Sequence, residues 1–547
     1  MEQERQTING QIVDVLTGSI FPGEIVIEGA HIVEINKVPK ASHHYILPGL
    51  VDAHVHIESS MLVPSEFARL AVVHGTVATV SDPHEIANVC GIPGIDFMIE
   101  NAAQVPFYFY FGAPICVPAT KFETAGAGIS AEDISILLAR ENIHYLTEMM
   151  NYPGVIDQDP EVMEKLKIAK ALGKPIDGHA PGLRGEEAKT YFAAGISTDH
   201  ECFSYEEALE KIQLGVNILI REGSAAKNFD ALIGLLKIYP EKIMFCSDDK
   251  HPDALVLGHI NHLLHRAVKV GCRPMDAIRA ATLNPVKHYH LKNGLLQIGD
   301  AADFIIVKDL EDFQVLETWI KGQKIAAKGK TLIPSHPAKR INNFNCNYLG
   351  VDDIRLEPES NFISVIEVHD GQLITGSSQA EILTENNNVI SNVNNDVLKL
   401  VVLNRYQSNT KPAIGFVKNF NLREGAMASS VAHDSHNIIA LGTDDESIVR
   451  AINLVIEEQG GISYVGPNDH SVIPLPIAGL MSDHDGYEIA EAYQSIDLEI
   501  KKSGCTLNAP YMTLSFLALL VIPELKLSDL GLFDGKAFRF KNLFITS

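Results

Sequence analysis

The sequence predicts an α/β protein with three parts: a (β/α)8 barrel of the TIM type, a small β-sandwich domain built from both flanks of the barrel, and a C-terminal α+β domain. The barrel is predicted by eight short apolar runs that alternate with longer helical patterns. Eight is the number of strands that closes such a barrel, which typically spans ~250 residues. The segments before and after these runs have a different pattern of apolar and polar residues, and they predict the two further domains.

The apolar runs end in turn residues or polar side chains, as short buried strands do. Helical patterns separate them, for example at 131–140, 159–172 and 205–214. Because strands and helices alternate, we expect a parallel sheet with the helices outside it. The eight runs lie at residues 49–56, 76–82, 107–111, 145–149, 175–179, 196–200, 216–220 and 243–248.

The flanks of the barrel carry short strands. Those before it lie at 12–15, 24–28 and 31–35, and segments 302–308 and 318–325 have the same pattern. Neither flank alone supplies enough strands for a stable sheet, so we expect the two to combine. The predicted β-sandwich domain therefore consists of residues 1–45 plus 295–345, and the barrel of residues 46–294.

The ~200 residues after the second flank are long enough to form an independent core. Strand-like segments at 397–403 and 413–417 are followed by a helical pattern at 446–459. We therefore predict a C-terminal α+β domain over residues 346–547.

The charge balance excludes some classes of partner. The chain has 547 residues, with 44 basic and 69 acidic side chains, so its formal charge is 44 − 69 = −25. A surface of this sign repels phosphates, and we expect binding neither to nucleic acid nor to an anionic membrane. A small neutral molecule remains possible as a ligand.

Cysteine usage and the chain's most apolar segments predict a cytoplasmic protein. The seven cysteines are an odd number without a CxxC pair, which is typical of a reducing compartment. The first residues lack the basic start and the apolar run of a secretory signal. The apolar stretch 511–522 is shorter than the ~20 residues of a membrane-spanning helix.

The first apolar run contains a His-x-His pair. Side chains two residues apart on a strand point to the same side, so His54 and His56 can present two imidazoles to one metal ion. Taken alone, such a pair is weak evidence, because two strand histidines often face solvent or a hydrogen-bond partner.

Four more polar residues stand at or near the ends of other runs: Glu148, His179, His200 and Asp248. The carboxyl ends of barrel strands meet at one mouth, where active sites are built. Buried separately, each of these side chains would need its own polar partner. Together with His54 and His56 they predict a metal site.

Six ligands are too many for one catalytic ion, which typically takes three from the protein. We therefore expect two divalent ions, one held by His54, His56 and Asp248 and the other by His179 and His200, with Glu148 bridging them. A hydroxide between the ions is the expected nucleophile, and Asp248 the expected proton shuttle. Imidazole and carboxylate ligands suit Mn, Fe or Zn, and the sequence does not choose among them.

With these residues in place, the chain resembles the amidohydrolase superfamily over residues 1 to about 340, including the segments 281–285 and 299–303. Several stretches further resemble the bacterial adenine deaminase family within it. They are 81–89 (SDPHEIANV), 149–155 (MMNYPGV), 177–181 (DGHAP), 221–227 (REGSAAK) and, near the C-terminus, 425–437 (GAMASSVAHDSHN).

The resemblance implies hydrolysis of adenine to hypoxanthine and ammonia, a purine-salvage reaction in which the hydroxide attacks C6. Many members of the superfamily use a carboxylated lysine as the bridging ligand; here Glu148 occupies that position, as in adenine deaminases. The chain departs from adenosine-type deaminases, because Ala180-Pro181-Gly182 follows His179 where those enzymes carry a nearby acid. We expect adenine as the small-molecule partner and a homo-oligomer, namely a dimer.

Two alternatives remain at this stage. One is another nucleobase deaminase or a cyclic amidase of the superfamily, and the other is a noncatalytic scaffold on the same fold. Because that acid is absent, the residue that donates a proton to the substrate must come from elsewhere, and Glu85 and His84 are the two candidates. These two residues could instead form a loop salt bridge or place a charge at a helix N-terminus.

Further residues are candidates for substrate contact. Arg221, Glu222 and Ser224 follow the seventh run and could read the purine edge, or form a solvated loop; Asn151 and Tyr152 could contact the base.

His433, Asp434 and His436 could form a lid over the mouth or hold a third metal, since the two histidines would share a helical face. Alternatively, Asp434 caps a structural turn.

Overall fold

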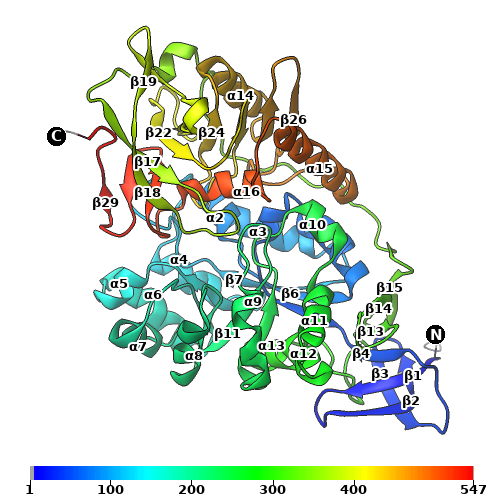
Figure 1. Ribbon diagram of the computed structural model, residues 1–547. Coiled ribbons are helices and arrows are strands. Elements are labelled where there is room, and N and C mark those ends of the chain that lie inside the picture. Colours follow the sequence, from blue (N-terminus) through cyan, green and yellow to red (C-terminus); the bar gives the residue numbers. More distant parts are fainter. Residues whose placement is uncertain (1–4, 546–547) are drawn as a thin grey trace.

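The computed structural model describes residues 5–545, so the first four and last two residues of the predicted domain spans lie outside it. The barrel occupies the middle of the molecule, the C-terminal domain sits on one end of it, and the N-terminal strands lie at the opposite side (Figure 1). This arrangement confirms the predicted fold class.

Eight parallel strands form the barrel, and each lies within or overlaps one predicted run. Five of them pair in sequence order, as do the last three. Two backbone hydrogen bonds join these groups: Ser197 donates to Ile176 (2.9 Å) and Asp248 donates to His54 (3.0 Å). The barrel strands are β5 (Leu50–Val55), β6 (Thr76–Ser81), β7 (Tyr108–Ala113), β8 (Ile143–Met149), β9 (Ile176–Gly178), β10 (Thr198–Asp199), β11 (Asn217–Arg221) and β12 (Ile243–Cys246).

Helices cover the outside of the barrel, and their ends follow local capping rules. Ser130 and Asp133 form a capping box at the start of α4, and Asp159 caps α6 ahead of a proline at its first position. The barrel helices are α1 (Pro64–Ala71), α2 (His84–Cys90), α3 (Ile92–Ala102), α4 (Ala131–Leu138), α5 (Tyr152–Ile156), α6 (Pro160–Ala171), α7 (Gly185–Ala193), α8 (Tyr205–Gln213), α9 (Phe229–Leu232), α10 (Pro252–Leu257), α11 (Ile260–Lys269), α12 (Pro274–Ala280) and α13 (Leu283–Tyr289).

Strands from both flanks of the barrel join in one sheet of eight, in the order β16-β15-β14-β13-β4-β1-β2-β3. β4 is the joint, because it pairs parallel with β1 and antiparallel with β13. The sheet surrounds its own apolar core, which includes Ile25, Phe304 and Trp319. Its strands are β1 (Arg5–Asp14), β2 (Ser19–Glu28), β3 (His31–Lys37), β4 (Tyr45–Pro48), β13 (Phe304–Val307), β14 (Val315–Ile320), β15 (Gln323–Ala327) and β16 (Lys330–Thr331).

The C-terminal domain is built on a second sheet of eight strands, in the order β18-β17-β22-β21-β24-β23-β25-β26. Its helices are α14 (Asp445–Glu457), α15 (Gly486–Lys502) and the short α16 (Pro510–Ser515). The strands are β17 (Phe362–Glu367), β18 (Gly376–Glu381), β21 (Leu398–Leu403), β22 (Ala413–Lys418), β23 (Ala426–Ser429), β24 (Ile438–Gly442), β25 (Gly461–Val465) and β26 (His470–Pro474), with β19 (Leu383–Glu385) and β20 (Asn388–Ile390) as a separate hairpin and β27 (Leu525–Ser528), β28 (Gly531–Asp534) and β29 (Arg539–Phe540) as a third small sheet.

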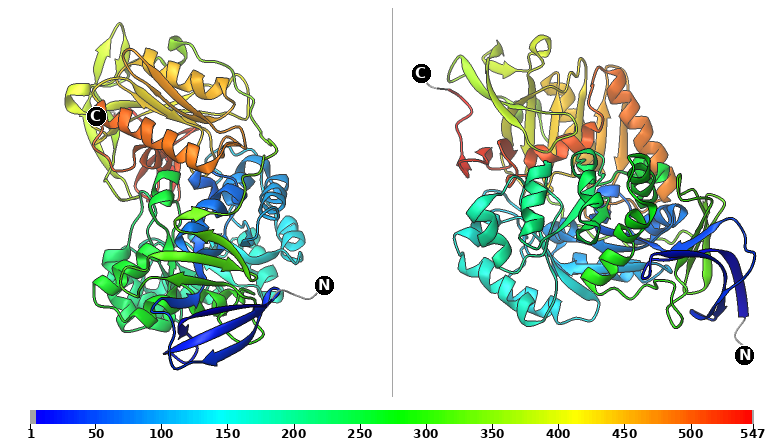
Figure 2. Two further views of the ribbon diagram at one scale, coloured as in Figure 1. Left: turned by 90° about the vertical axis from the view of Figure 1, so that its right-hand side faces the viewer. Right: turned by 60° about the horizontal axis from the view of Figure 1, so that its bottom comes forward.

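The C-terminal domain packs on the mouth of the barrel, as two further views show (Figure 2). Polar contacts fix the interface: Arg69 of α1 pairs with Asp485 at 2.7 Å, and the Asn437 amide donates to the carbonyl of Thr124 at 2.9 Å. Within residues 5–545, no helix is long and apolar enough to cross a membrane.

Candidate metal centre and active site

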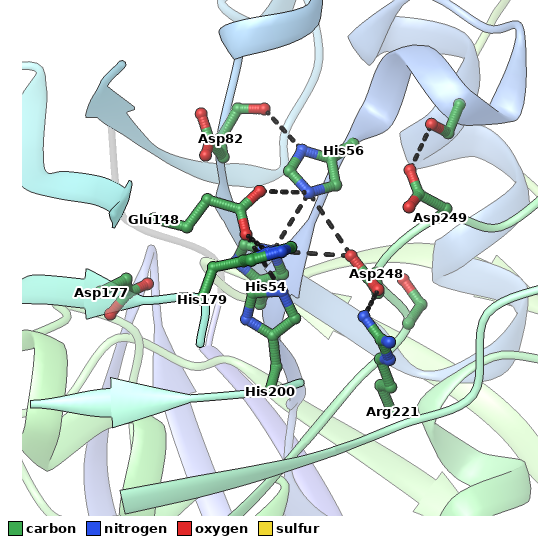
Figure 3. A network of polar contacts seen from close by, with 12 residues as sticks. His54, His56, Asp82, Glu148, Asp177, His179, His200, Arg221, Asp248 and Asp249 are labelled. Carbon is green, nitrogen blue, oxygen red and sulfur yellow. Dashed lines mark hydrogen bonds and ion pairs between the residues drawn. The ribbon is translucent and has the colours of Figure 1, made fainter. Parts of the chain in front are cut away.

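The six predicted ligands meet at the mouth of the barrel (Figure 3). They come from five strands: His54 lies on β5 with His56 directly after it, Glu148 on β8, and the others follow β9, β10 and β12. All six are buried, with at most 4% of each residue exposed. The pattern of polar residues at strand ends therefore produces one cluster.

Glu148 lies at the centre of this cluster. Its Oε2 is 2.7 Å from His179 Nδ1 and 3.1 Å from His200 Nε2, and its Oε1 is 3.3 Å from His56 Nε2. One carboxylate therefore contacts imidazoles from three strands, which is the geometry of a bridging ligand.

The second group consists of His54, His56 and Asp248. The two Nε2 atoms are 3.1 Å apart, and Asp248 Oδ1 lies 3.6 Å from the first and 3.4 Å from the second. Two imidazole nitrogens at this separation, facing one carboxylate oxygen, match the donor set expected around a divalent ion.

The electrostatics of the cluster fit bound cations. Burial raises the pKa of Glu148, but His179 and His200 oppose this and hold the pKa well below its usual range. Burial and the neighbouring imidazoles lower the pKa of His54 well below its usual value. Burial also disfavours charge on the other three imidazoles, but the neighbouring carboxylates raise the pKa of His56 and His179 above the usual value and that of His200 to about 9. Without bound ions the carboxylates therefore hold protons on these imidazoles, and divalent ions would take the place of those protons.

The donor set supports the same conclusion. His54 faces His56 and Asp248 with Nε2, and His179 faces Glu148 with Nδ1, so each ring turns one nitrogen to the cluster. Imidazole nitrogens and carboxylate oxygens are ligands that suit divalent ions. The residues present thus fit divalent ions.

His84 begins α2 beside the cluster. Its Nδ1 lies 3.1 Å from Asp82 Oδ2 and 3.6 Å from Glu148 Oε1, while its Nε2 lies 3.7 Å from Asp434 Oδ1 of the C-terminal domain. The imidazole therefore stands between the metal ligands and the C-terminal domain.

Glu85, the next residue, faces the C-terminal domain. Its Oε1 is 2.9 Å from His433 Nδ1 and its Oε2 is 2.7 Å from His436 Nε2. His433 and Asp434 therefore line the cavity beside the predicted ligands, and His436 contacts Glu85.

A narrow, partly open cavity lies over the cluster. Its walls combine the barrel's ligands with His84, Glu85 and five residues of the C-terminal domain. Those five are Leu373, His433, Asp434, Phe516 and Leu519.

Two protein-family models match this chain, one over the barrel and one over the C-terminal domain. The amidohydrolase family model matches residues 45–325, and the model of the adenine deaminase C-terminal domain matches residues 372–539. An adenine deaminase of Methanosarcina barkeri is 54% identical, with 98% of this chain and 99% of that protein covered. The chain belongs to the adenine deaminase family.

Two further family members match over almost their whole length. The adenine deaminase of Sulfurovum sp. is 53% identical, covering 96% of this chain and 98% of that protein. That of Parabacteroides distasonis is 46% identical, and both chains are covered completely. Both the barrel and the C-terminal domain therefore share the family's architecture.

Four residues predicted to contact the purine lie outside the walls of the cavity. Glu222 pairs with Arg266 at 2.7 Å, and Ser224 accepts a hydrogen bond from the backbone N–H of His251 at 2.9 Å. Asn151 caps α5 by accepting from Gly154, and Tyr152 is half-buried in the same helix. We therefore assign none of these four side chains a contact with the substrate.

Arg221 was expected to read the purine edge, but its guanidinium is bound to two carboxylates. It pairs with both oxygens of Glu201 and donates to Asp248 Oδ2 at 2.6 Å. Burial opposes the charge of Arg221, but the two carboxylates raise its pKa above the usual value. Arg221 is therefore a positioning residue for Asp248.

Glu201 is a residue that the sequence reasoning missed. It follows His200 directly, and its Oε1 lies 3.6 Å from His200 Nε2 and 3.7 Å from His179 Nδ1. The available signal was an acidic residue immediately after a predicted ligand at a strand end.

We expect the Glu201–Arg221 pair to be a strong stability determinant. Arg221→Gln leaves Glu201 buried without its guanidinium partner, which typically costs about 3–5 kcal/mol of unfolding free energy. Glu201→Gln should cost less, because Arg221 keeps its contact with Asp248. The double variant should cost less than the sum of the two, because the residues act as a pair. Denaturant unfolding at fixed metal loading measures these differences.

Arg184→Gln is the matched control, since Arg184 pairs with Glu210 at the surface and should change stability little. Strict additivity of the two buried substitutions would contradict the pairing.

Proposed function

We propose that this protein hydrolyses adenine to hypoxanthine and ammonia. The observation that carries the proposal is the match to adenine deaminases at 46–54% identity over essentially the whole chain. The polar cluster beneath the narrow cavity supplies the chemistry that such a hydrolysis needs.

We propose two divalent ions at the cluster, Mn, Fe or Zn. His54, His56 and Asp248 would hold one and His179 and His200 the other, with Glu148 between them. When bound, such ions lower the pKa of a water in contact with them from 15.7 to about 7.

Asp248 is suited to move a proton in this reaction. Arg221 binds Oδ2, which leaves Oδ1 directed toward His54 and His56 at the floor of the cavity. Oδ1 accepts a proton from the attacking water and returns it to the amino group that leaves C6. The guanidinium keeps this orientation fixed.

His84 is the better of the two candidates for protonating the ring nitrogen beside C6. Its Nδ1 lies 3.6 Å from Glu148 Oε1 and 3.1 Å from Asp82 Oδ2. Burial opposes a charge on this ring, but Asp82 and Asp434 raise its pKa well above the usual value, so that it carries a proton to donate. Glu85, by contrast, is held between His433 and His436. We therefore assign the ring-nitrogen proton to His84 Nδ1 and a docking role to Glu85. When the C6–N bond breaks and the C6 carbonyl forms, the second proton of the attacking water leaves the C6 oxygen and restores the proton on His84.

The expected substrate profile is ammonia release from adenine and little or none from guanine, cytosine, adenosine or hydantoin. A coupled ammonia assay on metal-loaded protein measures it. Turnover of another ring with adenine inert would retain the superfamily and overturn the substrate. Absence of ammonia from every compound would favour a noncatalytic scaffold.

Removal of the metal should abolish ammonia release, and about two equivalents of Mn²⁺ per chain should restore it, because the ligands form two groups. Metal analysis before and after chelation measures the stoichiometry. His179→Asn should bind about one equivalent less than the unmodified protein. Full activity of the metal-free protein would contradict the proposed centre.

Asp248→Asn should retain the fold and lose at least ~100-fold in kcat, the low end for a group that transfers protons. Circular dichroism and metal content control for misfolding and for loss of metal. A kcat close to that of the unmodified protein would exclude the proton-transfer role.

A further inference from the structure

Five residues of the C-terminal domain form the wall of the cavity opposite the metal ligands: Leu373, His433, Asp434, Phe516 and Leu519. We call these five residues the roof, and Glu148, His179, His200 and Asp248 the floor. A substrate in this cavity touches the floor with its reacting atom and the roof with its remote edge.

The roof is held in place by buried contacts. The His433 imidazole stacks on Phe516 with ring centroids 4.3 Å apart, and Glu85 binds His433 from the barrel side. Lys526 donates to the carbonyls of Leu373 (2.8 Å) and Phe516 (2.9 Å). The side chains of the roof are therefore pre-positioned for a ligand.

Asp434 is the acidic residue of this wall. Only 2% of the residue is exposed, and its Oδ2 has no hydrogen-bond partner within residues 5–545. Its Oδ1 lies 3.7 Å from both His84 Nε2 and His433 Nδ1, beyond hydrogen-bond distance. A buried carboxylate oxygen without a donor is costly, so this atom fits an N–H of the ligand.

The placement of His84 shows where Asp434 lies relative to the chemistry. The Nδ1 atom of this imidazole is 3.6 Å from Glu148 Oε1, and its Nε2 atom is 3.7 Å from Asp434 Oδ1. Glu148 of the floor and Asp434 of the roof therefore contact the two nitrogens of the same ring.

The chemistry of adenine identifies the edge that faces the roof. Hydrolysis takes place at C6, so C6 and its neighbour N1 must lie at the floor. The edge most remote from C6 carries N3 and N9, and N9–H is the hydrogen-bond donor on that edge. N7 lies on the side of C6 and does not reach the roof in this orientation.

We propose that Asp434 accepts a hydrogen bond from N9–H of the substrate and so restricts the enzyme to the free base. The proposal rests on the proposed function, since it requires C6 at the floor. In nucleosides and nucleotides N9 carries a sugar, which removes the donor and places a bulky group against Phe516 and Leu519.

The test compares adenine with 9-methyladenine, which lacks the N9 hydrogen but keeps the reacting atoms. In the unmodified protein, kcat/KM should strongly favour adenine. In Asp434→Ala, kcat/KM for adenine should fall about 10- to 100-fold, the range for a hydrogen bond to a charged group, whereas the value for 9-methyladenine should change little. The preference for adenine should shrink by the same factor.

Two further variants sharpen the comparison. Glu123→Gln is the matched control, because Glu123 is a buried carboxylate close enough to Asp434 to influence it electrostatically but lies outside the cavity wall. It should leave the preference unchanged. Asp434→Asn keeps the shape of the side chain with a weaker acceptor, should reduce the preference partly, and serves if Asp434→Ala does not fold.

An equal loss for adenine and 9-methyladenine in both Asp434 variants would overturn the contact with N9. Where 9-methyladenine releases no ammonia, its inhibition constant against adenine replaces kcat/KM in the comparison. Failure of the proposed function is distinguishable, because the unmodified, metal-loaded protein would then release no ammonia from adenine at all.

Discussion

The closed barrel forces ionisable groups from distant segments into one buried volume, and Glu148 is the group on which that arrangement depends. Its two oxygens contact imidazoles that follow or end three different strands. An ionised carboxylate buried in this way is stable only with positive charge around it. Although burial disfavours charged imidazoles, the carboxylates raise the pKa of His56 and His179 and raise that of His200 to about 9, so protons or bound cations can supply this charge.

The same constraint explains the role of the C-terminal domain. All six predicted ligands are buried in the folded chain, and five residues of the C-terminal domain line the cavity beside them. The contacts of Glu85 with His433 and His436 tie the two domains together next to the cavity. The active site is therefore a property of both domains, not of the barrel alone.

The sequence predicted the fold and the ligand cluster because both depend on local patterns. The alternation of apolar runs and helices located all eight barrel strands. Because the carboxyl ends of barrel strands meet at one mouth, the residues at those ends could then be placed close together. Glu148 and His179 could be placed together in this way although no local signal links them.

Residues beyond the strand ends were harder to predict. Glu222 and Ser224 lie within three residues of Arg221, yet they face Arg266 and His251, because the loop turns away after the strand. The direction of a loop side chain depends on its neighbours in space. The contact of Glu85 with His433 joins residues 348 positions apart (433 − 85), which no sequence period reveals.

Asp248 shows how backbone and side-chain constraints combine at this site. Its φ of +54° is unusual for a residue other than glycine, and such a conformation persists only where the surroundings enforce it. Here its N–H donates to the carbonyl of His54, which ties it to β5. Arg221 holds one carboxylate oxygen, so the other must point at the histidines. The two oxygens of Asp248 therefore have separate partners: Arg221, which also pairs with the buried Glu201, fixes Oδ2, and Oδ1 alone faces the predicted metal site.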